Sequence, residues 1–346
     1  MSAAVRTAPP PPAPRTARTS SLLRVRELGI LLLIVVVFVA ATVKNGEFAS
    51  AHSIQQLLTG AAIIALLCVG ETLVIVTRNV DLSVGSVLGI SAYVVGMFFR
   101  DHPHAPIWAG FLIGILLGAA VGAVNGLVVT VLRVPSLVVT LAALYIIRGI
   151  DGLIVKGVTI NPSSIPNSFQ AVGYKNVLGV PWLFLIVTVV VVAVGYAMRS
   201  FRSARDLYAI GSNPEAAVLA GIPTGRRVFT AFVISGLLAG LGGALFLALH
   251  ATVDVRAGTG YELLVVAAVV VGGVAIFGGS GTVFGAALAA LLLNTINQAL
   301  VSSRVSAFWT DAIAGALLLA AIAFDHWLSL RVTRSLTSAE GAHRDV

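Results

Sequence analysis

Long apolar stretches alternate with short polar ones along most of this chain. The pattern predicts ten membrane-spanning helices, at about residues 29–43, 54–76, 82–99, 107–131, 137–150, 180–198, 228–249, 261–277, 283–300 and 307–324. Several of these stretches approach or exceed the ~20 apolar residues that a helix needs to cross a bilayer core of ~30 Å. A backbone exposed to lipid must satisfy its hydrogen bonds within each segment. We therefore predict an all-α polytopic membrane protein.

Composition agrees with that class. Of the 346 residues, 58% are hydrophobic and only 10% are charged, against roughly 25% charged in an ordinary soluble domain. We divide the chain into a disordered Pro- and Arg-rich cytoplasmic tail (1–27), a transmembrane domain (28–326) and a cytoplasmic C-terminal tail (327–346).

The net charge of +8 is best explained by topology. If the N-terminus is inside, most of the 22 Lys and Arg residues fall on the cytoplasmic side, as the positive-inside rule expects. An even number of spans then returns both termini to the cytoplasm. Binding to nucleic acid is excluded, because no soluble domain carries interleaved basic and aromatic residues.

One long polar interruption, residues 199–227, contains five arginines. Within it, Asn213 suits a helix N-cap, Pro214 the first helical position, and Glu215 the positive end of the helix dipole. Gly221 then ends the helix. We predict a helix of about two turns on a basic cytoplasmic loop.

A second polar segment, TRNVDLSVGS at residues 77–86, lies between two apolar spans with no room for a loop. It must reach the cytoplasmic surface or interrupt a helix at membrane depth, where protein or a water-filled cavity has to surround it. The Asp81 carboxylate can cap the next helix by accepting from the amide of Ser83 or Val84. The other interpretation is that these polar groups line a solute path.

Further polar residues occur within or near the spans, and each either pairs structurally or lines a substrate path. On a continuous helix Glu71 and Arg78 would share a face, and Arg148 and Asp151 are spaced to pair. The full set is Glu71, Asn125, Arg148, Asp151, Glu262, Asn294, Asn297, Gln298 and Asp311.

Four glycines, Gly236, Gly240, Gly242 and Gly243, fall in one span. Small residues let membrane helices approach closely, so these glycines predict tight helix packing.

The sequence shows no motif for nucleotide hydrolysis, metal binding or catalysis. The glycine-rich GGSG at 278–281 lacks the Gly-Lys-Ser/Thr ending of a phosphate-binding loop, so any ATP hydrolysis must come from a partner. His102 and His104 are too few fixed ligands for a metal, and the single Cys68 fits a core position. No catalytic arrangement is present, and we expect neither an enzyme nor a cofactor.

Three segments resemble the membrane permeases of ribose-type ABC sugar importers: residues 77–86, the stretch YAIGSNPEAAVLAGI at 208–222, and the late block 272–285 followed by Asn294, Asp311 and Asp325. The resemblance covers about residues 29–325. It implies a type II ABC importer-like fold in the cytoplasmic (inner) membrane. It also implies three kinds of partner: a cytoplasmic ATPase, an extracytoplasmic sugar-binding protein, and a second permease copy in a homodimer or heterodimer.

The resemblance also assigns roles to residues. The ATPase-coupling helix would consist of Asn213, Pro214, Glu215, Ala216, Ala217, Gly221 and Ile222. The helix break beside the translocation path would be marked by Asp81, Ser83, Gly85 and Ser86. To the path we add the neutral and polar residues Asn125, Asn294, Asn297 and Gln298.

This chain has Arg78-Asn79 where ribose-type members usually show two glycines, and its late glycine-rich block is less polar. The variant is closer to branches that import rhamnose or the furanosyl autoinducer signal, which favours rhamnose over ribose as the sugar. The competing hypothesis is a proton- or sodium-coupled secondary transporter that uses Glu71, Asp81 or Asp311.

Overall fold

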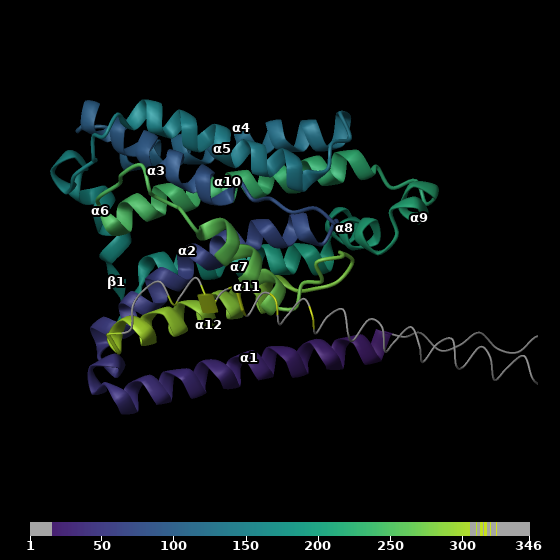
Figure 1. Cartoon of the computed structure of the whole chain (residues 1–346), viewed down its shortest axis with the longest axis horizontal. Helices are drawn as coiled ribbons and strands as arrows, with labels where there is room; N and C mark the ends of the chain where they lie inside the picture. The colour runs from purple at the N-terminus through teal and green to yellow at the C-terminus, as the bar shows by residue number, and fades with distance from the viewer. Residues whose placement is uncertain are drawn as a thin grey trace, which may run out of the picture.

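The computed structural model describes residues 16–304 and scattered residues between 309 and 323. This part of the chain forms a bundle of helices (Figure 1). Eight of its helices are long and apolar enough to cross a membrane, so the predicted fold class is confirmed. They are α1 (Thr16–Lys44), α2 (Ala51–Ile75), α3 (Val84–Asp101), α4 (Ile107–Val131), α5 (Ser136–Val155), α7 (Trp182–Ser200), α10 (Thr224–His250) and α12 (Val283–Ser302).

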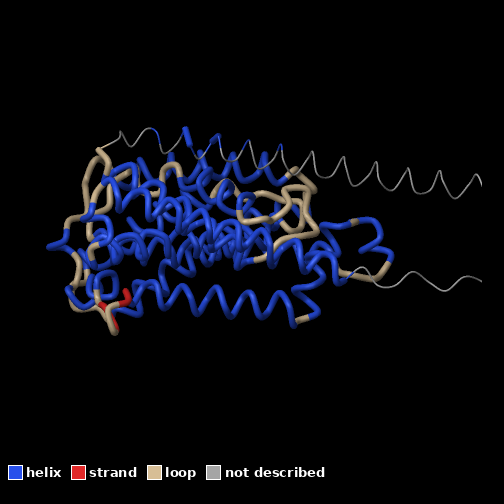
Figure 2. Tube along the Cα trace, turned by 90° about the horizontal axis from the view of Figure 1, so that it is seen from below, coloured by secondary structure: helices blue, strands red, loops and turns tan. Residues whose placement is uncertain are grey.

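Shorter elements close the two ends of the bundle. One end, called the α9 end here, carries α8 (Arg202–Ser212) and α9 (Pro214–Leu219) (Figure 1). The opposite α6 end carries α6 (Asn167–Tyr174) and a small antiparallel hairpin, drawn red in Figure 2. The hairpin pairs β1 (Asn176–Val177) with β2 (Val180–Pro181). The remaining elements are α11 (Tyr261–Val271) and the 3-10 helices η1 (Gly46–Ala49) and η2 (Pro162–Ser164).

Two of the predicted boundaries need correction. The expected eighth span, 261–277, contains only the 11-residue helix α11, which is about 16 Å long at ~1.5 Å per residue and too short to cross the bilayer core. Helix α1 begins at Thr16, inside the segment 1–27 that we expected to be disordered. Most of the tenth predicted span, 307–324, lies outside the described residues.

The connection before α11 supplies the missing length as non-helical backbone. At the α6 end, Val253 and Ile160 exchange backbone hydrogen bonds of 3.2 and 2.9 Å. From there the chain returns into the bundle, where Gly258 packs against Gly85 in the first turn of α3. Figure 1 shows this connection running back from the α6 end before α11 starts. Residues 251–260 therefore form a re-entrant segment, which is anchored in the bundle by the buried residues Val253, Ala257 and Gly258, while most of its other residues are exposed.

The connection between α2 and α3 also folds back into the bundle (Figure 1). The Glu71 carboxylate accepts from the Asp81 amide at 3.0 Å, and Glu71 lies one turn before the end of α2. Residues 76–83 thus run alongside α2 before α3 begins. Both interruptions lead to the same part of the bundle, because Gly85 contacts Gly258.

Glycines let α4 and α10 approach until their backbones touch. A Cβ at Gly118 would overlap the carbonyl oxygen of Gly236, and one at Gly236 would overlap that of Gly118. A turn away, a Cβ at Gly240 would overlap the Gly114 carbonyl. The prediction of close packing at Gly236 and Gly240 is confirmed, with partner glycines on α4 that share the four-residue spacing.

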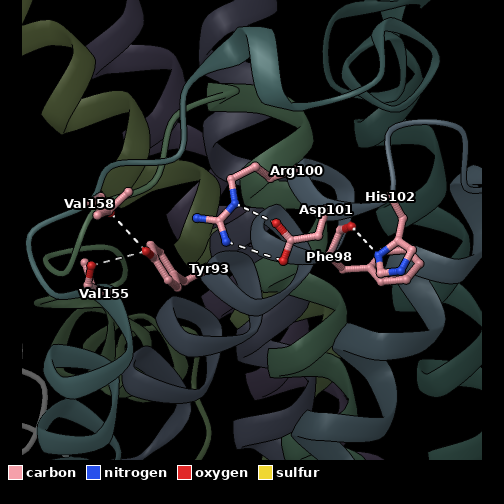
Figure 3. Close-up of polar contacts among 7 residues, drawn as sticks. All are labelled: Tyr93, Phe98, Arg100, Asp101, His102, Val155 and Val158. Carbon is pink, nitrogen blue, oxygen red and sulfur yellow. Dashed lines mark hydrogen bonds and ion pairs between the residues drawn. The ribbon is translucent and has the colours of Figure 1, made fainter.

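The first of the two histidines, His102, is the C-cap of α3 (Figure 3). His102 is exposed and stacks on Phe98, with ring centroids 5.0 Å apart. Arg100 and Asp101 beside it form an exposed ion pair of 2.9 Å. Among the described residues, no group of three or more His, Cys, Asp or Glu is placed to hold a metal ion.

We expect Gly118→Val to destabilise the fold, because the branched Cβ and its two methyl groups would overlap the backbone of α10 and force the two helices apart. Overpacking of this kind costs about 1–3 kcal/mol or more. Size-exclusion chromatography of the detergent-solubilised protein after heating at graded temperatures would show earlier aggregation than in the wild type.

The matched control is Gly149→Ala on α5, where nothing lies within 4 Å of the added Cβ. Alanine there should leave the thermal midpoint unchanged or raise it, because alanine favours the helix by about 1 kcal/mol. Equal stability of both variants would contradict the close-packing interpretation.

Candidate functional site at the interrupted helices

A buried polar cluster occupies the point where α3 begins. The Asp81 carboxylate accepts from the Ser83 amide at 3.0 Å and the Ser83 hydroxyl at 2.6 Å, and its second oxygen accepts from Ser235 of α10 at 3.3 Å. Asn125 of α4 donates to the Ser83 hydroxyl at 2.9 Å. One oxygen of Glu71 receives the Asp81 amide, and the other, Oε2, has no hydrogen-bond partner among the described residues. Four segments thus converge on two buried carboxyl groups.

The contact predicted for Asp81 is present, but Asp81 does not hold the N-cap position that we predicted for it. Its carboxylate accepts from Ser83, one of the two expected partners, beside the positive end of the α3 dipole. The N-cap position itself is taken by Ser83. Ser86 donates back to the Ser83 carbonyl at 2.8 Å. The start of α3 is therefore held mainly by its own polar side chains.

Arg78 does not share a face with Glu71, because α2 ends at Ile75. Its backbone is left-handed, with φ of 67°, and its side chain reaches the last residues of α8. Nε donates to the Gly211 carbonyl at 2.5 Å and Nη2 to the Ser212 carbonyl at 2.9 Å. A guanidinium at these carbonyls also complements the negative end of the α8 dipole.

The late glycine-rich loop joins the same contact. The Gly279 amide donates to the Val76 carbonyl at 2.9 Å, directly after α2. Tyr208 of α8 donates to the Gly281 carbonyl at 3.0 Å. Burial raises the pKa of Tyr208 to about 12, so its phenol keeps the donated proton at neutral pH. Three segments that the sequence singled out separately are therefore hydrogen-bonded to one another.

The loop at 199–227 contains the predicted short helix and one that we did not expect. Helix α9 starts as predicted, with Asn213 Oδ1 accepting from the Ala216 amide at 3.0 Å and Pro214 as the first residue. It ends before Gly221, whose φ is +74°. Sequence reasoning missed α8. Its signal is an apolar face at Leu207 and Ile210, both of which are buried.

Helix α8 is fastened to the transmembrane bundle, whereas α9 projects from it (Figure 1). Asp206 of α8 forms an ion pair of 2.9 Å with Arg227 at the start of α10. On α9, Ala217 is buried, but the Val218 and Leu219 side chains are 60% and 89% exposed. Exposed apolar side chains such as Val218 and Leu219, on a helix whose neighbour α8 is bonded to the bundle, are typical of a surface that binds another protein.

The structure does not bring all of the predicted path residues together. Hydrogen bonds link Asp81, Ser83 and Asn125. Gly85 instead packs against Gly258 and Glu262. Asn294 donates to the Leu57 carbonyl at 2.8 Å, in the α6 half of α2. Asn297 and Gln298 follow Asn294 along α12, away from the cluster. Asp311 lies outside the described residues. The transport roles of these residues remain predictions.

The expected close pairing of Arg148 with Asp151 does not form: the two groups interact electrostatically, but no hydrogen bond or ion pair of the described residues joins them. Arg148 Nη1 donates instead to the Ala257 carbonyl of the re-entrant segment at 2.6 Å. Asp151 is 1% exposed, and neither of its carboxylate oxygens has a partner among the described residues. The helix spacing places the two side chains near each other, but the Arg148 guanidinium donates to the Ala257 carbonyl, which has no helical partner.

Comparison with known proteins identifies this architecture. A family model described as "Branched-chain amino acid transport system / permease component" matches residues 53–322. The chain belongs to this permease family. The predicted resemblance is confirmed, and the permease is a multi-pass membrane protein that works with a separate ATPase and a substrate-binding protein, as ABC importer permeases do.

Several curated relatives are similar to the permease over nearly their whole length. The autoinducer 2 import system permease protein LsrC of Enterobacter sp. (strain 638) is 35% identical over 91% of this chain and 90% of its own. The protein of the same name from Photorhabdus luminescens is 34% identical over 87% and 89%, and that from Escherichia coli (strain K12 / DH10B) is 33% identical over 90% and 90%. No solved structure matches the chain significantly.

We expect Arg78→Gly to loosen α9 without unfolding the permease. Glycine accepts the left-handed backbone that costs other residues roughly 1–2 kcal/mol, but the two bonds to α8 disappear. Hydrogen bonds from a charged group contribute about 1.5–3 kcal/mol each when well formed. Amide hydrogen exchange in residues 212–221 should become at least about tenfold faster.

Arg133→Gly is the matched control, because Arg133 is also left-handed, with φ of 57°, and is exposed. It removes the same backbone strain and the same charge, and should leave exchange at 212–221 unchanged. Similar exchange in both variants would show that Arg78 does not hold the loop.

Proposed function

We propose that this permease carries autoinducer 2 or a closely related small sugar into the cytoplasm, driven by ATP hydrolysis in its partner. The observation that carries the proposal is that Arg78, three residues before Asp81, is hydrogen-bonded to the end of α8, directly before the projecting helix α9. The relatives are named as autoinducer 2 import permeases, which favours autoinducer 2 as the solute. Rhamnose and ribose are the next candidates, as the sequence resemblance suggested.

The orientation follows from charge. Helix α9 sits beside exposed arginines, among them Arg199, Arg202, Arg205 and Arg226, so the positive-inside rule supports placing the α9 end in the cytoplasm. Thr282, at the start of α12, donates to Glu27 of α1 at 2.9 Å, which puts the N-terminal part of α1 at that end too. We therefore propose that the N-terminus is cytoplasmic, and that an even number of crossings brings the C-terminus to the same side.

The surface for the ATPase is α9. Asn213, Pro214, Glu215, Ala216, Ala217, Gly221 and Ile222 would form the coupling element, with Val218 and Leu219 as its exposed apolar contact. The α6 end would face the extracytoplasmic binding protein. A second permease copy, identical or related, would complete the transporter.

A mechanical route leads inward from α9. Movement of α9 displaces its N-cap Asn213 and the adjoining Ser212, whose carbonyl Arg78 binds. Arg78 stands three residues before Asp81, so the displacement reaches the polar cluster at the start of α3. Alternating access then needs only a small shift of a segment that is non-helical and held by side-chain hydrogen bonds.

One observation favours a second candidate, the ion-coupled transporter. Glu71 and Asp81 are both buried, and Glu71 Oε2 has no described partner, as expected of a carboxyl group that exchanges a proton. Uptake into proteoliposomes decides between the two. Autoinducer 2, L-rhamnose and D-ribose would be offered with the binding protein, with and without the ATPase and internal ATP. Uptake that requires both supports our proposal, whereas uptake driven by a proton or sodium gradient alone would refute it.

We expect Leu219→Asp to weaken ATPase binding at least about tenfold, or by ~1.4 kcal/mol, because a charge would replace the most exposed apolar side chain of α9. The measurement is titration of the purified ATPase onto the permease in nanodiscs. The control is Leu178→Asp in the hairpin at the α6 end, where Leu178 is fully exposed. Unchanged affinity in the α9 variant, or equal loss in both, would exclude α9 as the docking surface.

A further inference from the structure

Three charged side chains face one another where the re-entrant segment passes between α3 and α5. Arg148 projects from α5 and holds the Ala257 carbonyl. Asp151 lies one turn further along the same helix, and Glu262 lies in the first turn of α11. Arg148 interacts electrostatically with both carboxylates. We call these three residues the polar seam.

Glycines in α3 make room for the seam. A Cβ at Gly89 would overlap the Ala257 carbonyl and approach Arg148 Nη1, and a Cβ at Gly85 would overlap Glu262 Oε2. The two glycines are one turn apart on the same face of α3. The re-entrant backbone and its charged neighbours can therefore lie directly against the helix.

The seam is hydrogen-bonded only in part. Four of its buried atoms have no partner among the described residues: Arg148 Nη2, Asp151 Oδ1, Asp151 Oδ2 and Glu262 Oε2. An unpaired buried polar group costs several kcal/mol, and a buried charge costs more. Other buried polar side chains nearby, such as Ser83 and Asn125, are satisfied within the protein. Several unpaired hydrogen-bond donors and acceptors in one place indicate a ligand that binds there transiently.

The chemistry of the seam selects the kind of partner. One guanidinium donates and two carboxylates accept, which gives the three residues a formal net charge of −1. Asp254 of the re-entrant segment adds a further negative charge that acts on Asp151, so the site disfavours anions. A neutral molecule with several adjacent hydroxyl groups can donate to the carboxylates and accept from the guanidinium at the same time. Charged acceptors and donors also form the stronger class of hydrogen bond with such hydroxyls.

We propose that Arg148, Asp151 and Glu262 form a transient binding site for a neutral polyhydroxylated solute on its way through the permease. The inference rests on the proposed function for the class of solute, and extends it by naming a site away from the Asp81 cluster. The site lies against the re-entrant segment, whose Ala257 carbonyl Arg148 binds. It would sense hydroxyl groups and so contribute to selectivity.

Cysteine modification tests the site without requiring transport. The permease would carry Asp151→Cys with Cys68→Ala and be placed in nanodiscs, and a small charged methanethiosulfonate would be added with or without 100 mM D-ribose. We expect modification, followed by mass spectrometry, and at least threefold slower modification with the sugar. The control is Asp101→Cys in the same background, at an exposed position, where the sugar should have no effect.

Three results would overturn the proposal: no modification of the cysteine at 151, a rate unaffected by D-ribose, or protection by sodium or potassium chloride alone, which would indicate a cation site. If Asp151→Cys does not fold, Glu262→Cys serves for the same measurement.

Selectivity of uptake is the second readout. In the complete transporter, Asp151→Asn and Glu262→Gln should lower the uptake ratio of D-ribose to 2-deoxy-D-ribose at least threefold relative to the wild type, with Asp101→Asn as control. A merely structural role would lower both uptakes equally and leave the ratio unchanged, which would refute the site. If the wild type takes up neither sugar with ATP, uptake of autoinducer 2 and L-rhamnose decides the proposed function, and the cysteine experiment decides the site.

Discussion

The need to satisfy every backbone polar group inside the membrane governs this structure. Where the chain is not helical, at residues 76–83 and 251–260, side chains and neighbouring loops supply the missing partners. The Val80 amide is bonded by Ser136 and the Val80 carbonyl by Thr140, both from α5. Glu71 receives the Asp81 amide, and Arg148 holds the Ala257 carbonyl. Much of the buried polarity thus supports interrupted helices, and only the few unpaired atoms are available for a solute.

The interruptions also explain how a solvent-facing loop can act on the interior. A continuous helix resists bending, but a segment held by single hydrogen bonds can shift between arrangements. Residues 76–83 contact α8 through Arg78 and the glycine-rich loop through Val76. The same segment continues into Asp81 and the start of α3. The proposed docking helix α9, the Arg78 contact and the polar cluster at Asp81 therefore form one connected path. The close glycine contact of α4 with α10 provides a rigid frame beside this path.

Particular residues show how far sequence reasoning reached. The caps of α9 and the carboxylate contact of Asp81 with Ser83 were predictable, because their partners lie within three residues along the chain. The packing role of Gly236 and Gly240 was predictable from spacing, although not which helix they would meet. The pairs Glu71 with Arg78 and Arg148 with Asp151 were wrong, because that reasoning assumed unbroken helices and did not include carbonyls from distant segments.

Local physics in the sequence by itself determined the membrane class, most of the spans, the short capped helix and the absence of a nucleotide site. Only the tertiary structure decided that the eighth span is half helix and half re-entrant backbone. It alone decided that Arg78 binds α8, and that Asp151 and Glu262 keep unpaired oxygens beside Arg148. These outcomes depend on which backbone carbonyls lose their helical hydrogen-bond donors where helices are interrupted, and on which side chains pack beside them. Such contacts join residues more than 100 positions apart, and no periodicity along the chain records them.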